Sequence, residues 1–225
     1  MIKNTYKGKF IVFEGLDGSG QSTQVKLLGD YLKNKKQRIL LTKEPTQKAY
    51  ASSVMPLIHD VLAHKKKISA HELQKLFSQD RKEHLENRVI PALKKNITVI
   101  SDRYAFSSFA YGKASGLELD WLVKLNKNFL KPDICFFLNT NPKTCMNRIN
   151  MRGNKHDLFE KHKTLKKVYK NFLLLTKKFK YIKIINGEKS INQVFYEIQT
   201  NNWLRNPCST CNSQQDVLFL QKSWV

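Results

Sequence analysis

The chain of 225 residues has little cysteine, few acidic residues and no long apolar run, and these features narrow the classes of protein to which it can belong. Four cysteines in a chain of this length do not make a disulfide framework. Because no apolar stretch approaches about 20 residues, the sequence predicts no membrane-spanning helix. Residues 1–9 are polar and basic and lack the apolar segment of a signal peptide, so we expect a cytoplasmic protein.

The 18 acidic residues face 40 basic ones, which gives a net charge of +22. A basic surface attracts nucleic acid, and binding to nucleic acid is therefore one alternative. Only 7 of the basic residues are arginine, however, and the lysines are scattered or gathered in short runs such as 65–67. A solvated, lysine-rich surface explains this pattern better. The few arginines then stand out, because their planar fork suits phosphate.

Short apolar stretches alternate with segments of helical periodicity along most of the chain. Strands are predicted at residues 10–13, 38–42, 97–100, 134–138 and 181–185. Helices are predicted from residue 22 onward and at 71–95, 142–152, 157–178 and about 190–203. This alternation indicates an α/β fold, in which helices cover both faces of a parallel five-stranded sheet.

From residue 205 onward the pattern fades, so we expect one domain over 1–204 and a tail over 205–225 that the core does not need. Within the tail, Cys208 and Cys211 form a lone CxxC pair. A metal or redox site is the minor alternative there, because no second pair or histidine accompanies them.

A glycine-rich turn directly follows the first predicted strand and precedes a helix. Such a turn places backbone N–H groups around phosphate oxygens, and the helix N-terminus adds partial positive charge. The spacing matches a P-loop, GxxxxGK[ST], in which the Ser22 hydroxyl would contact Mg²⁺. The phosphate-binding residues that this motif predicts are Gly15, Gly18, Ser19, Gly20, Gln21, Ser22 and Thr23.

Gln21 stands where the P-loop lysine is expected. An amide donates hydrogen bonds but carries no charge, so it does not neutralise the charge that develops on a transferred phosphoryl group. Losing one preorganised donor costs on the order of 10²–10³ in rate. Catalysis therefore requires a cation from another part of the chain, or it is weak.

Several separated motifs resemble the thymidylate kinases, P-loop enzymes that phosphorylate dTMP with ATP. The motifs are FEGLDGSGQST at 13–23, KEPT at 43–46, LFSQDR at 76–81, SDRY at 101–104 with SSFAY at 107–111, KPD at 131–133, a basic segment at 148–155 and ING at 185–187. The block at 101–111 is the most discriminating, because related deoxynucleoside kinases differ after the Asp-Arg pair. The resemblance spans about residues 8–200 and implies a helical lid at about 148–160.

On the acceptor side, the resemblance implies that Asp17 contacts the sugar hydroxyl and the phosphate site. Arg103 would bridge the acceptor and donor phosphates, and Tyr111 would pack near the deoxyribose. Phe77 and Arg81 share a helix face, so Phe77 could stack on the base while Arg81 donates to its carbonyl. The implied dTMP-binding residues are Asp17, Glu44, Pro45, Phe77, Arg81, Arg103, Ser108 and Tyr111.

On the donor side, the resemblance implies ATP binding by Arg148, Asn186 and Gly187 beside the P-loop, and Mg²⁺ binding by Ser22 and Asp102. Because Gly18 follows Asp17, the family pattern places the catalytic cation in the lid. Arg152 is then expected to compensate for Gln21, and the catalytic set is Asp17, Arg103 and Arg152. Relatives are commonly homodimers, so we expect a homodimer.

Two alternatives concern the activity itself. Gln21 is compatible with a nucleotide-binding pseudokinase of weak activity. Gly112 follows Tyr111 where relatives carry a polar side chain that can bond the base, so another pyrimidine monophosphate such as dUMP is an alternative substrate.

Overall fold

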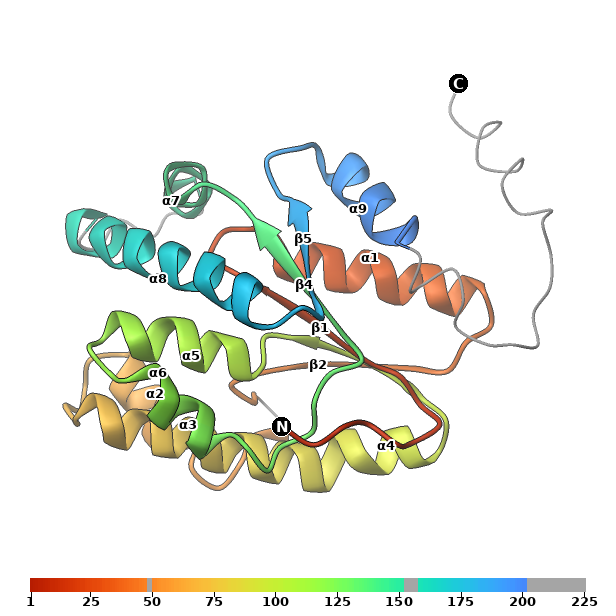
Figure 1. Ribbon diagram of the computed structural model, residues 1–225, viewed down its shortest axis with the longest axis horizontal. Helices are drawn as coiled ribbons and strands as arrows, with labels where there is room; N and C mark the ends of the chain where they lie inside the picture. Colours follow the sequence, from red (N-terminus) through yellow and green to blue (C-terminus); the bar gives the residue numbers. More distant parts are fainter. Residues whose placement is uncertain (48–49, 152–157, 202–225) are drawn as a thin grey trace.

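The computed structural model describes residues 1–47, 50–151 and 158–201 of the chain. Five strands form one parallel sheet in the order β2-β3-β1-β4-β5 (Figure 1). They are β1 (Phe10–Gly15), β2 (Ile39–Lys43), β3 (Thr98–Asp102), β4 (Ile134–Asn139) and β5 (Ile182–Asn186). The sheet therefore confirms the five predicted strands and their parallel arrangement. The predicted tail and residues 152–157 of the predicted lid, Arg152 included, lie outside the described residues.

Four helices lie where the periodicity predicts them: α1 (Gln21–Asn34), α7 (Pro142–Asn150), α8 (Leu158–Lys178) and α9 (Ile191–Gln199). Three more were not predicted: α2 (Met55–Leu62), α5 (Ala105–Ala114) and α6 (Leu119–Leu125). Helix α5 is buried on most of its sides, which leaves no polar face to mark a helical period.

The predicted helix over 71–95 is not one continuous α-helix, and this corrects the sequence prediction. It consists of α3 (Ala70–His84), a π-helical turn η2 (Leu85–Val89) and α4 (Ile90–Lys94). A capping box at Ser69 and Glu72 starts α3. Pro91 has no amide hydrogen to donate to the preceding turn, so the regular ladder is interrupted just before it.

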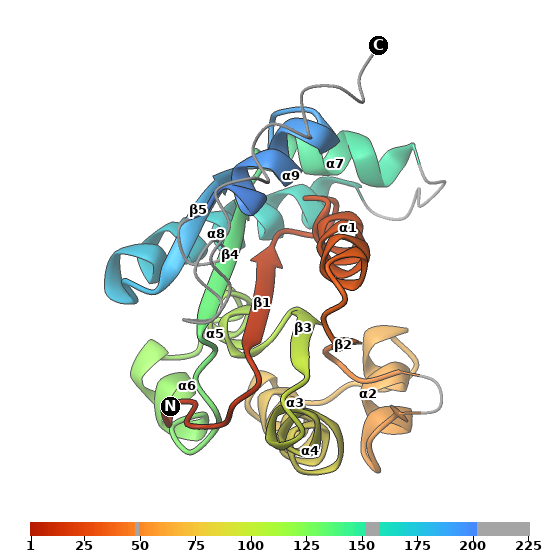
Figure 2. The same ribbon diagram turned by 90° about the vertical axis from the view of Figure 1, so that its right-hand side faces the viewer.

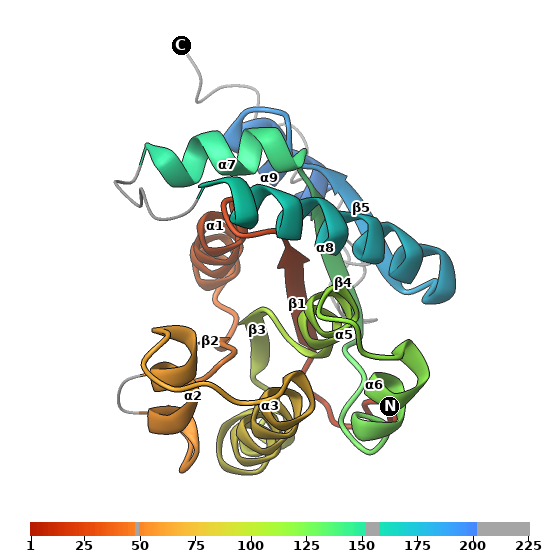
Figure 3. The same cartoon turned by 90° about the vertical axis from the view of Figure 1, so that its left-hand side faces the viewer.

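The central strands β1, β3 and β4 are almost completely buried on both faces, and alternate side chains of β1 enter two different cores. Phe10 and Val12 pack into the core that includes α5 and α8, whereas Ile11 and Phe13 pack into the core beneath α1 and α9. Figures 2 and 3 show α1 on one side of β1 and both α5 and α8 on the other. No helix within the described ranges is long and apolar enough to cross a membrane.

All five strands are parallel, so their carboxyl ends meet at one edge of the sheet. Strands β3 and β2 lie to one side of β1, and β4 and β5 lie to the other. Crossovers thus leave the central strands in opposite directions, and a crevice at this edge is where such sheets bind ligands. The glycine-rich turn after β1 lies at this edge.

Candidate active site

The turn between β1 and α1 has the backbone of an anion-binding loop. Gly18 (φ 83°) and Gly20 (φ 99°) are both in the left-handed region. A Cβ at Gly18 would lie 2.6 Å from the carbonyl oxygen of Cys145, whereas one at Gly20 would meet open space. The Ser19 hydroxyl and the Gln21 Nε2 are buried without a hydrogen-bond partner among the described residues. Unused donors around an open cradle at a helix N-terminus fit a phosphate group.

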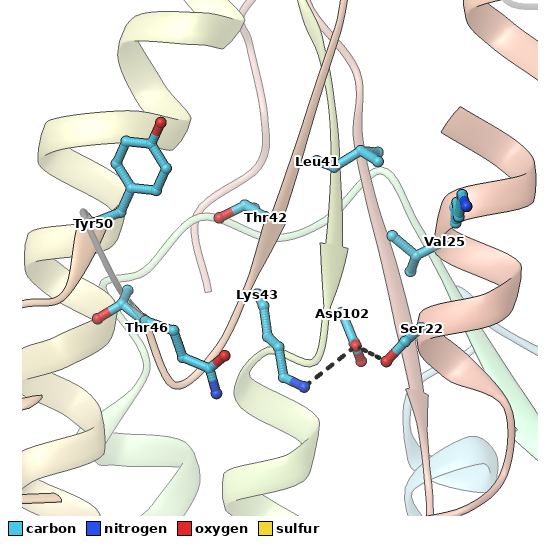
Figure 4. Close-up of a pocket in the computed structure, with 10 residues that line it drawn as sticks. Ser22, Val25, Leu41, Thr42, Lys43, Thr46, Tyr50 and Asp102 are labelled. Carbon is cyan, nitrogen blue, oxygen red and sulfur yellow. Dashed lines mark hydrogen bonds and ion pairs between the residues drawn. The ribbon is translucent and has the colours of Figure 1, made fainter. Parts of the chain in front are cut away.

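Ser22, the second residue of α1, meets the end of β3. Its hydroxyl donates to Asp102 Oδ2 at 2.5 Å, and Lys43 Nζ lies 3.6 Å from the same oxygen (Figure 4). These side chains line a cavity of about 350 Å³ together with residues of β2 and the segment after it, and Tyr50 stands at its far side. Thr23 is exposed beside Ser22.

A hydroxyl and one carboxylate suit Mg²⁺, which usually takes one or two protein ligands and completes its shell with phosphate oxygens and water. No group of three or more histidine, cysteine or acidic side chains gathers into a metal cage anywhere in the described ranges. The Ser22–Asp102 pair therefore fits a nucleotide-dependent Mg²⁺ rather than a metal held by protein alone.

Arg103, directly after β3, has a left-handed backbone (φ 75°) and joins several elements. Its guanidinium donates to the carbonyl oxygen of Gly15 (3.2 Å), to Ser107 Oγ (2.8 Å) and to Asp17 Oδ1 (2.8 Å). The Tyr111 hydroxyl donates to the other oxygen of Asp17 at 2.9 Å, and the Tyr111 ring lies 5.5 Å from the guanidinium. Burial disfavours the charge of Arg103, but Tyr111, Asp17 and other acidic neighbours outweigh it and raise its pKa. A permanent cation is thus held beside the P-loop.

Glu14, the fifth residue of β1, is completely buried beneath this arginine. Its carboxylate accepts from the backbone N–H groups of Tyr104 (2.9 Å) and Ser107 (3.1 Å) and from the Ser107 hydroxyl (2.6 Å). Burial raises the pKa of Glu14 to about 7, although the bond from Ser107 and the charge of Arg103 oppose the shift. Glu14 therefore fixes the first turn of α5, and with it the serine that orients Arg103.

Arg81, near the end of α3, is 3% exposed and has three bonds to side chains from separate elements. It donates to Glu44 Oε2 (2.8 Å), to Ser108 Oγ (3.0 Å) and to Asn126 Oδ1 (2.5 Å). Glu44 also bonds His84 at 3.0 Å and precedes Pro45 through a cis peptide bond. A buried guanidinium held this way has a fixed orientation, which suits recognition of a planar, polar ligand.

Phe77 lies one helical turn before Arg81 on α3 and is partly buried. On the other side of β1, Arg148 of α7 donates to the carbonyl oxygens of Ser19 (3.4 Å) and Gly187 (3.3 Å). A Cβ at Gly187 would collide with the side chain of Thr140, so the close approach of the Gly187 backbone to Thr140 requires glycine. Asn186 is exposed and accepts from the N–H of Glu188 at 3.0 Å.

Most of the predicted site residues thus form three connected groups at the carboxyl edge of the sheet, beside the Ser22–Asp102 pair. One joins the P-loop to Arg148 and Gly187, one joins Asp17, Arg103 and Tyr111, and one joins Arg81 to Glu44 and Ser108. Arg152 is not placed, because it lies outside the described residues.

Four residues of the site are absent from the predicted set: Glu14, Lys43, Ser107 and Asn126. Three of them lie inside or beside predicted motifs, so their position in the sequence was a usable signal. Asn126 belongs to no motif, and only the packing of α6 brings it to Arg81.

Comparison with known proteins gives a consistent result. A family model described as thymidylate kinase matches residues 13–198. A protein of Thermococcus kodakarensis described as "Probable thymidylate kinase" is 39% identical over 193 residues, which cover 84% of this chain and 94% of the relative. A thymidylate kinase of Caldicellulosiruptor saccharolyticus is 36% identical over 201 residues, covering 86% and 95%, and one of Desulfotalea psychrophila is 35% identical over 192 residues, covering 85% and 92%.

Proposed function

The chain belongs to the thymidylate kinase family, and on this premise we propose that it transfers the γ-phosphoryl group of ATP to dTMP, giving dTDP and ADP. The observation that carries the proposal is Arg103, whose guanidinium joins the P-loop at Gly15 to the acidic Asp17. A cation at this junction can contact a donor phosphate and an acceptor phosphate at once, as in-line phosphoryl transfer requires.

The acceptor nucleotide would lie between α3 and α5. Phe77 would stack on the pyrimidine, and Arg81 would donate to a carbonyl of the base. Asp17 and Tyr111 would face the sugar and the phosphate. Glu44 and Ser108 support this pocket, because both bond Arg81 directly, and Pro45 follows Glu44 in the same segment.

The donor nucleotide would place its phosphates on residues 15–23 and its adenine near Asn186 and Gly187. Arg148 supports this arrangement, because it ties the phosphate loop to Gly187. Ser22 and Asp102 would hold Mg²⁺, which neutralises charge on the β- and γ-phosphates when bound. Lys43 shares Asp102 and would remain nearby as a second cation.

We propose that lid residue Arg152 supplies the charge that Gln21 does not carry. Support for this proposal comes from Gln21, because its Nε2 is buried without a partner in the described part of the chain and carries no charge. Different groups would then bind the substrate and catalyse the reaction: backbone N–H donors would bind the phosphates, and arginines would stabilise the transition state.

The direct test is ADP release by the purified full chain with ATP, Mg²⁺ and one of four acceptors: dTMP, dUMP, UMP or dCMP. We expect the highest kcat/KM with dTMP. A preference for dUMP would replace the substrate but keep the enzyme class. If no acceptor is turned over and Gln21→Lys creates turnover, the chain is a nucleotide-binding pseudokinase.

Two further expectations stay predictions. A homodimer is expected from the family pattern, and sedimentation of the full chain at micromolar concentration tests it. Residues 1–204 are expected to keep activity without residues 205–225, which deletion of the tail tests.

A further inference from the structure

Gln74 of α3 is a buried amide that lacks a hydrogen-bond partner on its oxygen. The side chain is 5% exposed, and no donor reaches Oε1 within the described residues. A buried carbonyl oxygen left unpaired costs about 1–3 kcal/mol, so such groups are uncommon in folded proteins. An unpaired acceptor of this kind is explained if a ligand supplies the donor.

The amide lies at one end of the contact between α3 and α5, which are neighbours in Figure 3. At that end, a Cβ on Gly112 would lie 3.4 Å from the amide carbon of Gln74 and 2.8 Å from Leu122 Cδ2. At the other end, Arg81 donates to Ser108 at 3.0 Å. Because glycine carries no Cβ at position 112, the Gln74 amide and Leu122 pack directly against the backbone of α5.

Gln74, Phe77 and Arg81 lie on one face of α3, because residues three, four and seven apart share a helix face. The partly buried Phe77 stands between a buried acceptor and a buried donor. A pyrimidine stacked on Phe77 could therefore donate an N–H group to Gln74 and accept from Arg81 on the adjacent carbonyl.

We propose that Gln74 reads the base of the acceptor nucleotide by accepting a hydrogen bond from N3–H on its Oε1. The inference rests on the proposed function for the position of the base, with the 4-carbonyl on Arg81 and N3–H toward Gln74. Thymine and uracil present this carbonyl and N–H pair.

Cytosine presents a 4-amino group and an unprotonated N3. Rotation of the Gln74 amide relieves the mismatch at N3, but Arg81 has only donors and does not accept from an amino group. Gln74 and Arg81 together thus select bases that carry N3–H and a 4-carbonyl, and they leave the 5-methyl group to packing.

Equilibrium binding to the full chain tests this inference with two ligands, dTMP and N3-methyl-dTMP, in which a methyl group replaces the N3 hydrogen and the 4-carbonyl is kept. We expect the wild-type chain to bind dTMP about 10- to 100-fold more tightly than the N3-methyl analogue. Gln74→Met keeps the size of the side chain and removes the amide, so the ratio should fall to within about threefold. Gln79→Met, on the exposed side of the same helix, should keep the wild-type ratio.

The ratio is measured on one protein preparation, so it does not depend on the fraction that is folded. A wild-type ratio near one, or an unchanged ratio in Gln74→Met, overturns the inference, and absence of binding by either ligand contradicts it as well. Turnover is measured separately. A chain that shows the binding ratio but does not phosphorylate dTMP supports the Gln74 contact and contradicts the proposed function. A chain that phosphorylates dTMP without showing the ratio supports the proposed function and contradicts the Gln74 contact.

Discussion

The two halves of the site hold charge in different ways. On the acceptor side, Arg81 and Arg103 each donate three hydrogen bonds to separate groups, so their positions are fixed by the fold. On the donor side, the P-loop offers backbone N–H groups, hydroxyls and the neutral amide of Gln21. The acceptor side therefore has its positive charges held in fixed positions by the fold. On the donor side, part of the positive charge that faces the ATP phosphates must come from residues outside the P-loop.

The largest effect should come from the acceptor half. Arg103→Met removes the cation between the P-loop and Asp17, and we expect kcat/KM for dTMP to fall by about 10³-fold or more. Arg103→Lys should restore little, because a lysine does not reach Gly15, Asp17 and Ser107 together. Arg38→Met, at the exposed start of the β2 region, is the matched control. A tenfold loss or less in Arg103→Met would contradict a central position for this arginine.

Arg152→Ala tests the donor half. If the lid supplies the missing charge, turnover should fall by about 10²–10³-fold while dTMP binding survives. Steady-state kinetics and dTMP binding on the same preparation check both parts. Lys163→Ala, an exposed lysine of α8, should change neither. An unchanged rate in Arg152→Ala would show that the compensating cation lies elsewhere, and Lys43 would be the next residue to remove.

Glu14, buried beneath Arg103 on the acceptor side, should make the free energy of unfolding depend on pH. Its pKa is raised from 4.5 to about 7, so folding favours the protonated carboxyl. The stability that this group contributes is present below pH 4.5 and is lost as the pH rises through 7. The loss amounts to about 3 kcal/mol, and Glu14→Gln should remove it. Urea unfolding at several pH values measures the difference between the two proteins.

Glu83→Gln provides the contrast for that experiment. The pKa of Glu83 is lowered by hydrogen bonds from Ser53, so its contribution is lost as the pH falls rather than as it rises. If the wild-type chain and Glu14→Gln show the same slope between pH 4.5 and 8, then Glu14 does not titrate in this range.

The smallest effect is expected at the metal pair. Asp102→Asn keeps an acceptor for the Ser22 hydroxyl but removes the charge, so the Mg²⁺ concentration for half-maximal rate should rise about tenfold. The KM for dTMP should stay near the wild-type value. Asp120→Asn, an exposed partner of Lys178, is the control. An unchanged Mg²⁺ requirement would remove Asp102 from the proposed metal site.

The sequence predicted the sheet well because its strands are continuous apolar stretches between helices. It also located the P-loop and most of the residues that meet at the sheet edge, because they belong to motifs at strand ends. It missed α5, whose burial on most sides leaves no helical period, and the π-helical turn before Pro91. The Asn126 contact with Arg81 and the unpaired oxygen of Gln74 depend on how separate helices pack, which no local pattern records.

The most direct test of the account compares ADP release by the wild-type chain and by Gln21→Lys, with ATP, Mg²⁺ and dTMP. The account predicts dTMP-dependent turnover by the wild-type chain, and a rate in Gln21→Lys within about tenfold of it, because another cation already does the work of the P-loop lysine. Turnover by the wild-type chain no higher than with ATP alone, together with activity created by Gln21→Lys, would contradict it.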